Sequence, residues 1–358
     1  MGAAASCARP AGTALNGGAV AKAPAALHRA RKAVGEVLDP EGLTLVACSG
    51  GADSLALAAA AAWHHGRSSG PLAAARVGGV VVDHHLHPDS AVVSGRTVSQ
   101  LKGLGLDPVR IYSADVDPES ALGPEAAART GRYQAFRDAM AELGASRILL
   151  AHTRDDQAEQ VLLGLARGSG TRSLAGIPPA RGPFRRPLLG LSRTDTEAIC
   201  RHYGLDWWQD PANSDPRFLR SKVRTQVLPY LERELAASLR DSLVRTAEIA
   251  AADADHLENQ AKQVFPTVLE DPDHTGALRL KLKGLRAEPP AIRRRVIALA
   301  VAAAGGANPS FERLVAVEKL VAGSRSAGPV ELEGRVTVSR GTRGTPDYGK
   351  LVVVPPSG

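Results

Sequence analysis

Up to Arg220, runs of apolar positions alternate with segments in which apolar and polar residues recur at helical spacing. Continuous apolar runs bounded by turn residues are typical of strands that are buried on both faces of a sheet. The predicted strands are residues 43–48, 77–86, 108–116 and 147–153. The predicted helices are residues 55–65, 94–104, 124–143 and 154–167. This alternation predicts an α/β domain with a Rossmann-like parallel sheet and helices on both faces.

The second part of the chain has a different pattern. From Leu235 to Phe265 the apolar residues step by threes and fours, which predicts one long helix with a narrow apolar stripe. Shorter helices are expected at 194–203, 290–304 and 309–322, and short strands near the end of the chain. We therefore expect a disordered leader over residues 1–26, the α/β domain over 27–232, and a mainly helical C-terminal domain with short terminal strands over 233–358.

One turn of the α/β domain has the composition of a phosphate-binding loop. Parallel sheets of this kind bind ligands at the carboxyl ends of their strands, and "SGGADS" directly follows the first predicted strand. Glycines allow close approach of the backbone to a ligand, and the next helix offers N–H groups and a positive dipole end to an anion. We expect this turn, formed by Ser49, Gly50, Gly51, Ala52, Asp53 and Ser54, to bind a nucleotide phosphate.

The presence of Asp53 in the turn indicates that a metal ion accompanies the phosphate. A carboxylate would repel a bare phosphate, so it indicates a phosphate bridged by magnesium, which prefers carboxylate oxygen. The turn lacks the Lys of a Walker loop, and the dinucleotide pattern Gly-x-Gly-x-x-Gly is missing too. We interpret "GTPDYGKL", residues 344–351, as a surface hairpin. The structural alternative for the turn is a tight bend in which Asp53 and Ser54 only cap a helix.

Charged residues gather after the fourth predicted strand and on the helix before it. Asp155, Asp156 and Glu159 fall in the first turn of a helix, where carboxylates complement the helix dipole. At the carboxyl edge of the sheet they would form an acidic pocket for magnesium or for a substrate ammonium group. Upstream, "EAAARTGRY" carries Arg129 and Arg132, which suit RNA phosphate as well as surface ion pairs.

Composition narrows the possible classes of protein. Hydrophobic residues make up 44% and charged residues 23%, an ordinary globular balance, and the net charge of +7 suits a polyanionic partner. No apolar run is long enough to predict a transmembrane helix. Cys7, Cys48 and Cys200 lie far apart, which argues against a zinc site, an iron–sulfur cluster or a disulfide framework. We expect a cytoplasmic protein that does not bind membranes.

Six segments, in order along the chain, closely resemble the tRNA(Ile)-lysidine synthase family of N-type ATP pyrophosphatases, in the PP-loop superfamily. They span residues 40 to 232 and read "SGGADS", "VDHHLHPDS", "EAAARTGRY", "AHTRDDQAEQVLLGLARGSG", "RRPLLGLSR" and "DPANSDPRFLRSKVRTQVLP". His85 stands where Gly is usual, Ala212 replaces a usual Ser, and Ser221 and Lys222 replace a usual Asn-Arg pair. We expect these departures to affect the docking of loops on RNA rather than the chemistry.

The resemblance implies a reaction, its substrates and its partners. ATP would adenylate carbon 2 of the wobble cytidine in tRNA(Ile) with anticodon CAU, with magnesium as the cofactor. The amino group of free L-lysine would then displace AMP, and the products would be lysidine, AMP and pyrophosphate. The C-terminal domain would recognise the tRNA, and a homodimer is left open.

The resemblance also implies roles for individual residues. Asp53, Asp156 and Arg129 would take part in catalysis, with Asp53 and Asp156 on the metal. Asp156 and Glu159 would bind lysine, and Asp156 is the candidate base for the attacking amine. The residues expected to contact RNA are Arg132, Arg167, Arg220, Lys222 and Arg224. His84 and His152 are further candidates for contact with the nucleotide.

Other interpretations remain open on the sequence alone. A tRNA-thiolating PP-loop enzyme would need cysteines for a persulfide or a cluster, and the cysteine spacing offers no pair. An amide-forming synthetase of the superfamily would work without RNA. A catalytically inactive RNA-binding PP-loop protein is opposed by the intact turn at 49–54 and its acidic partners.

Overall fold

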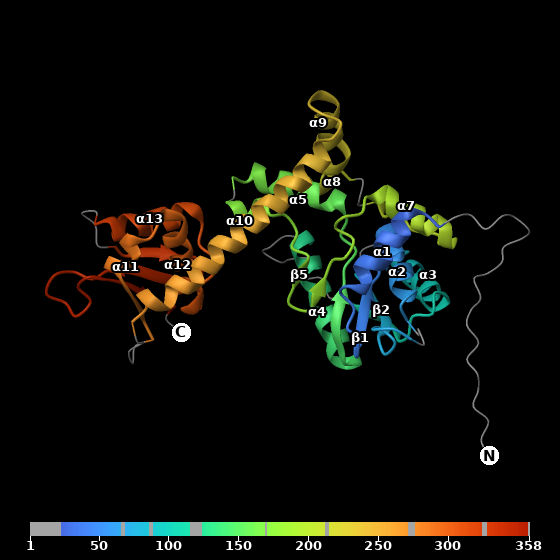
Figure 1. Ribbon diagram of the computed structural model, residues 1–358, viewed down its shortest axis with the longest axis horizontal. Helices are drawn as coiled ribbons and strands as arrows, with labels where there is room; N and C mark the ends of the chain where they lie inside the picture. Colours follow the sequence, from blue (N-terminus) through green and yellow to red (C-terminus); the bar gives the residue numbers. More distant parts are fainter. Residues whose placement is uncertain are drawn as a thin grey trace, which may run out of the picture. The chain divides into compact units, whose positions relative to one another are not determined.

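The structure is a computed structural model (Figure 1), and it describes residues 23–65, 69–85, 89–114, 124–168, 170–211, 215–270, 276–323 and 328–356. Most of the predicted leader lies outside these residues. Ala25 and Ala26, however, already belong to helix α1 (Ala25–Gly35), so the leader as predicted extends too far. The helix forms here because Ala26, Leu27, Ala30 and Val34 recur at helical spacing and are buried.

A sheet in the order β3-β2-β1-β4-β6-β5 organises the first part of the chain. Strands β1 to β4 and β6 run parallel to their neighbours, and only β5 pairs antiparallel, with β6. The bounds are β1 (Leu43–Ala47), β2 (Arg76–Asp83), β3 (Val109–Ser113), β4 (Ala145–Leu149), β5 (Ala180–Arg181) and β6 (Phe184–Arg185). The predicted parallel sheet is confirmed, and the two short strands β5 and β6 extend it.

Helices cover both faces of this sheet, as predicted. The central strand β1 sends Val46 into a core formed with α1, α2 and α7, and sends Leu43 and Leu45 into a core formed with α4. This alternation follows from the two-residue period of a strand. The helices are α2 (Ala52–Ala62), α3 (Ser90–Gly103), α4 (Pro124–Leu143), α5 (Arg154–Ala166) and α7 (Arg193–Tyr203).

The long predicted helix is α10 (Leu239–Val268), which begins four residues later than Leu235. Leu235 ends the preceding helix instead, because α9 (Leu228–Glu234) stops there and Ala236 to Ser238 form a turn. Helices α12 (Pro290–Ala303) and α13 (Phe311–Ala322) confirm the two shorter predicted helices. Two short helices, α6 (Thr171–Leu174) and α8 (Leu219–Lys222), and the π-helix η2 (Val223–Val227) precede α9.

A second, antiparallel sheet in the order β7-β10-β9-β8 lies near the end of the chain. Its strands are β7 (Leu278–Lys281), β8 (Val330–Leu332), β9 (Val336–Arg340) and β10 (Lys350–Val354), with α11 (Leu282–Ala287) after β7. Residues 344–351, "GTPDYGKL", run from the connection after β9 into β10, and the two strands pair antiparallel, which confirms the predicted hairpin. One core joins this sheet to α10, α12 and α13.

The contacts divide the chain into two compact units. The first comprises residues 1–155 and 179–213, and the second comprises 156–178 and 214–358. This division does not follow the predicted boundary between residues 232 and 233, which stays a prediction. Residues 156–178 and 214–232 belong to the second unit because α5 and α8 are joined by ion pairs and α6 packs on α10.

Candidate active site

The glycine turn joins β1 to α2 and is closed by Ser54. The Ser49 backbone N–H donates to Ser54 Oγ at 3.2 Å, and that hydroxyl donates to the Gly51 carbonyl at 2.9 Å. Gly51 is the extended N-cap residue of α2, so the first N–H groups of the helix point out of the turn. The turn therefore has backbone donors and the positive end of a helix dipole where an anion can bind.

Gly50 is required by both conformation and space. Its φ is +81°, a region that L side chains rarely adopt, and a Cβ on it would lie 2.5 Å from Thr97 Oγ1 on α3. Its carbonyl accepts a hydrogen bond of 2.9 Å from the Trp208 backbone N–H. The turn is therefore packed against α3 at Thr97 and hydrogen-bonded to the segment that contains Trp208.

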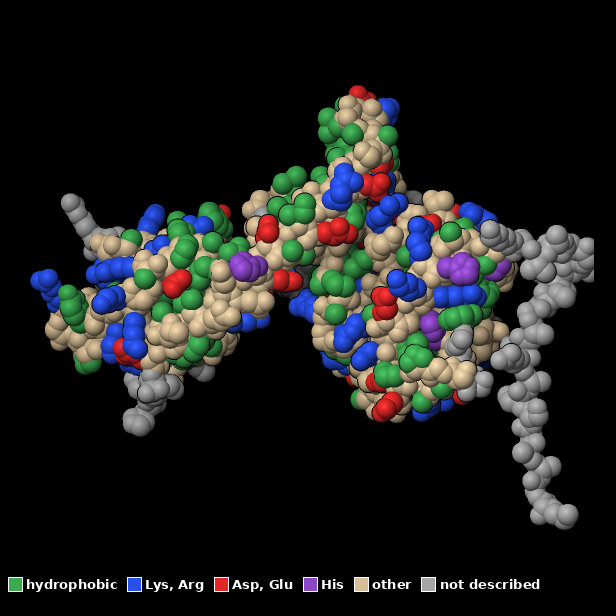
Figure 2. Space-filling model, viewed as in Figure 1, with side chains coloured by type: hydrophobic (Ala, Val, Ile, Leu, Met, Phe, Trp, Pro, Cys, Tyr) green, Lys and Arg blue, Asp and Glu red, His purple; other side chains and the backbone are tan. Residues whose placement is uncertain are grey.

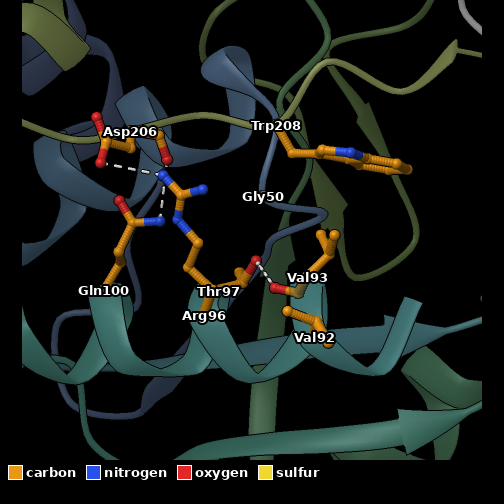
Figure 3. A pocket seen from close by; sticks show the side chains of 8 residues that line it. All are labelled: Gly50, Val92, Val93, Arg96, Thr97, Gln100, Asp206 and Trp208. Carbon is orange, nitrogen blue, oxygen red and sulfur yellow. Dashed lines mark hydrogen bonds and ion pairs between the residues drawn. The ribbon is translucent and has the colours of Figure 1, made fainter. Parts of the chain in front are cut away.

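A shallow pocket borders the turn at Gly50 (Figure 3). The Trp208 indole extends over one side, and Val92 and Val93 of α3 face it from the other. Farther along α3, Arg96 forms a 3.1 Å ion pair with Asp206. Trp208 therefore forms part of the wall of this pocket.

Asp53 lies in the first turn of α2 and is held by α7. Its Oδ1 accepts from the Thr196 hydroxyl at 2.5 Å, and its Oδ2 lies 3.2 Å from Arg193 Nη2. Thr196 is fully buried, and the Asp53 side chain is 18% exposed. Sequence reasoning did not single out Arg193 or Thr196, because no local pattern brings a residue of α7 to a turn so far away along the chain.

The carboxylates predicted on α5 are paired with arginines. Glu159, whose side chain is fully buried, accepts from Arg224 Nε at 2.5 Å and from Arg220 Nε at 3.0 Å. Asp156 Oδ1 accepts from the Nη2 atoms of both arginines, at 3.1 and 3.0 Å. Asp155 accepts from the Arg193 backbone N–H at 2.9 Å. The predicted acidic pocket is thus neutralised by two guanidinium groups at Asp156 and Glu159.

This cluster joins residues to which the sequence analysis gave different roles. Asp156 and Glu159 were expected to bind lysine, whereas Arg220 and Arg224 were expected to contact RNA. Lys222, between the two arginines, is exposed, and so is Arg167 at the end of α5. Among the predicted RNA contacts of the second unit, Lys222 and Arg167 therefore offer the more accessible charges.

Arg129 and Arg132 both lie on the exposed side of α4. The Arg129 guanidinium stacks over the Tyr133 ring at 5.1 Å, and Arg132 Nε donates to His84 Nε2 at 3.2 Å. Arg186, in contrast, is buried, with Nη2 3.5 Å from the Tyr133 hydroxyl. Burial removes Arg186 from the accessible basic surface.

His84 follows β2 and is half-buried. Burial, together with the neighbouring Arg132 charge, lowers its pKa from 6.5 to about 4. Because Nε2 accepts from Arg132, the neutral ring carries its proton on Nδ1. The next residue, His85, has φ +53° and donates its backbone N–H to Asp83 Oδ1, so a non-glycine residue holds a left-handed position.

The described cysteines, Cys48 and Cys200, flank the turn as buried free thiols. Cys48 Sγ donates to Ser54 Oγ, and Cys200 Sγ donates to the Ala52 carbonyl. Burial raises the pKa of both, and that of Cys200 reaches about 12. Thiols held neutral in this way are poor nucleophiles.

Asp53 is the one carboxylate in the turn at 49–54 that could bind a metal ion. Within the described residues, no group of three or more His, Cys, Asp or Glu side chains could hold a metal ion. Asp53 alone at the turn fits a magnesium ion whose other ligands are phosphate oxygens and waters, the usual arrangement for this ion. The described helices also include none that is long and apolar enough to cross a membrane.

Charge does not mark one RNA-binding face in the view of Figure 2. Lys and Arg side chains are spread over both units on this face, with Asp and Glu between them. In this view, therefore, neither unit shows a single basic patch.

Comparison with known proteins identifies the two parts of the chain. Residues 25–231 match the model of a PP-loop domain, and residues 280–342 match the TilS substrate binding domain. The chain is 46% identical over 297 residues to a tRNA(Ile)-lysidine synthase of Leifsonia xyli subsp. xyli, covering 83% of this chain and 87% of that protein. It is 44% identical over 345 residues to one of Salinispora arenicola, covering 94% and 98%.

Among solved structures, the U34-tRNA thiolase NcsA from Methanococcus maripaludis with its 4Fe-4S cluster is similar with a TM-score of 0.53. The sequence identity is 16%, and the match covers 63% of this chain and 78% of that one. A likeness at this identity concerns the fold alone.

The parallel sheet and the glycine turn at the start of α2 define a PP-loop ATP pyrophosphatase domain. The relatives and the C-terminal match narrow this class further. The chain belongs to the tRNA(Ile)-lysidine synthase family.

Proposed function

We propose that this protein ligates free L-lysine to carbon 2 of the wobble cytidine of tRNA(Ile) with anticodon CAU, at the expense of ATP. The observation that carries the proposal is the turn at 49–54, a set of backbone donors at a helix N-terminus, in a chain of the tRNA(Ile)-lysidine synthase family. The expected products are lysidine, AMP and pyrophosphate.

In the first step, the turn binds the β- and γ-phosphates of ATP. The cytidine O2 attacks the α-phosphorus, the bond from that phosphorus to the bridging oxygen breaks, and pyrophosphate leaves with the electron pair. The N–H groups of the turn and the dipole of α2 stabilise the charge that develops on this leaving group. Ser49 adds a hydroxyl donor, whereas the Ser54 hydroxyl donates to the Gly51 carbonyl and holds the turn closed. Magnesium held by Asp53 would supply further positive charge to the phosphates.

In the second step, the lysine amine attacks carbon 2, loses a proton and displaces AMP. Asp156 suits the ammonium group of lysine better than Glu159, because its side chain is 12% exposed whereas that of Glu159 is fully buried. Glu159, with both oxygens on guanidinium groups, holds Arg220 and Arg224 in place. Asp156 is then also the candidate base for the amine.

RNA contacts are assigned by accessibility. Arg129 and Arg132 on α4 and the exposed Arg167 and Lys222 are proposed to meet the tRNA backbone, since Arg and Lys contact phosphate without reading sequence. Arg220 and Arg224 reach phosphate only if they leave their carboxylates. The match of residues 280–342 to a substrate binding domain supports a tRNA-binding role for the C-terminal part.

The alternative of a tRNA-thiolating enzyme is not favoured. The two described cysteines are buried, and burial raises the pKa of each thiol, whereas thiolation needs a reactive sulfur carrier. The chain's relatives at 44–46% identity are tRNA(Ile)-lysidine synthases.

The adenylation half of the proposal is tested by pyrophosphate release without lysine. Purified protein with ATP, magnesium and tRNA(Ile) is expected to release pyrophosphate and to accumulate adenylated tRNA. The matched control is the same tRNA with the wobble cytidine replaced by uridine, which is expected to give no release. Equal release with both tRNAs would contradict the proposal.

A further inference from the structure

Arg193 is the first residue of α7 and approaches the glycine turn from outside it. Its Nη2 lies 3.2 Å from Asp53 Oδ2, and its side chain is 38% exposed. The contact is single, from one nitrogen to one oxygen, and not the two-pronged pair that a guanidinium forms with a carboxylate in its strongest geometry.

The backbone at Arg193 is fixed by several contacts. Ser192 and Asp195 form a capping box at the start of α7, and the Arg193 N–H donates to Asp155 Oδ2 at 2.9 Å. The Thr196 hydroxyl bridges the Arg193 carbonyl, at 2.8 Å, and Asp53. These contacts therefore fix the start of α7, so the Arg193 side chain extends from a fixed backbone position beside the turn.

The guanidinium has donors to spare. Of its five N–H groups, Nη2 contacts Asp53, and within the described part of the chain Nε and Nη1 have no hydrogen-bond partner. A half-exposed cation with unused donors, next to a turn that binds phosphate, is well suited to take phosphate oxygens.

We propose that Arg193 binds the β- and γ-phosphates of ATP and the departing pyrophosphate, and exchanges its contact with Asp53 for phosphate oxygens when ATP and magnesium bind. This inference rests on the proposed function of the turn. Without nucleotide, Arg193 neutralises Asp53. With nucleotide, Asp53 would hold the magnesium ion instead of Arg193, and Arg193 becomes available to the leaving group.

The role is electrostatic. As the bond between the α-phosphorus and the bridging oxygen breaks, negative charge gathers on pyrophosphate, and Arg193 donates N–H groups to it. No proton is transferred, since a guanidinium stays protonated in proteins. Thr196 acts differently: it holds Asp53 and does not reach the phosphates in this scheme.

Equilibrium binding of pyrophosphate, ATP and AMP, each with magnesium, tests the proposal. Arg193→Gln is expected to weaken the binding of pyrophosphate and ATP about tenfold or more, the effect of losing a charge-assisted hydrogen bond, and to leave AMP binding unchanged. Arg193→Lys keeps the charge but not the fork, so an intermediate loss is expected. The matched control is Arg201→Ala, which removes an exposed arginine from the same helix.

Two results would overturn the inference. Unchanged pyrophosphate affinity in Arg193→Gln, with the same shift in magnesium dependence as in Thr196→Val, would mean that Arg193 only positions Asp53. Equal weakening of pyrophosphate, ATP and AMP would mean a general disturbance of the site. The proposed function is judged separately, by tRNA-dependent pyrophosphate release in the unaltered protein, so failure of one can be told from failure of the other.

Discussion

Single residues of the turn differ in how far the sequence reveals their role. The sequence has two glycines between a predicted strand and a predicted helix, which indicates a backbone conformation that side-chain-bearing residues avoid. The left-handed φ of Gly50 agrees with that prediction. The contact between Gly50 and Thr97 of α3, and the hold of Thr196 and Arg193 on Asp53, could not be predicted. These contacts join segments far apart in the chain, and local spacing carries no signal for them.

Gly50→Ala is expected to destabilise the protein by about 1–3 kcal/mol and to abolish ATP turnover, because φ is positive and the new Cβ would clash with Thr97. Denaturant unfolding and pyrophosphate release measure the two effects. Gly95→Ala is the control: Gly95 lies in α3 with open space at its Cβ position, so a gain of about 0.5–1 kcal/mol is expected there.

Asp53→Ala is expected to abolish pyrophosphate release while leaving the protein folded. The reason is the loss of the one carboxylate at the turn that suits magnesium. Glu197→Ala, which removes the half-buried carboxylate that pairs with Arg201 on α7, serves as the control and should keep full turnover. Near wild-type turnover in Asp53→Ala would refute the metal assignment.

His84 gives a pH dependence of stability. Its pKa is 6.5 unperturbed and about 4 in the folded chain, so between these values the unfolded chain binds a proton that the folded chain does not. The free energy of unfolding therefore falls as pH drops from 6.5 toward 4. His84→Gln should remove on the order of 2 kcal/mol of this fall, measured by urea unfolding at several pH values. The same slope in wild type and variant would contradict the burial argument; His202→Gln is the exposed control.

At the scale of elements, periodicity predicted the long segments and missed the short ones. Strands β1 to β4, helices α2, α3, α4, α5 and α7 beside them, and α10, α12 and α13 were expected, because each carries an apolar pattern. Helix α1 was not predicted, because the short apolar stripe of Ala26, Leu27, Ala30 and Val34 lies in an alanine-rich segment next to the predicted leader. Helix α5 pairs with α8 and η2 through ion pairs between residues far apart in the chain. Such pairs leave no periodic pattern in the sequence.

Arg224→Ala tests this pairing of elements. The substitution leaves the buried Glu159 without its shortest partner, so a loss of about 3 kcal/mol of stability is expected. Lys222→Ala, on the exposed side of the same segment, should change stability by less than about 0.5 kcal/mol. Thermal unfolding of both variants separates a structural arginine from an accessible RNA-binding lysine. Equal stability of the two variants would contradict a structural role for the Arg224 pair.

At the scale of the whole molecule, sequence motifs predicted the family and the reaction class, and comparison with known proteins confirmed the family. The division into compact units was less predictable. The change to helical spacing predicts a boundary after residue 232, and contacts assign 156–178 and 214–232 to the second unit. Compact units are defined by packing contacts between segments that are far apart in the chain. Local sequence patterns do not reveal such contacts.

The most direct test of the central claim is transfer of labelled lysine to tRNA by the purified protein. With ATP and magnesium present, label is expected in tRNA(Ile) bearing a CAU anticodon, and omission of ATP, lysine or this tRNA should abolish it. Equal incorporation into unrelated tRNAs, or incorporation without ATP, would contradict the account.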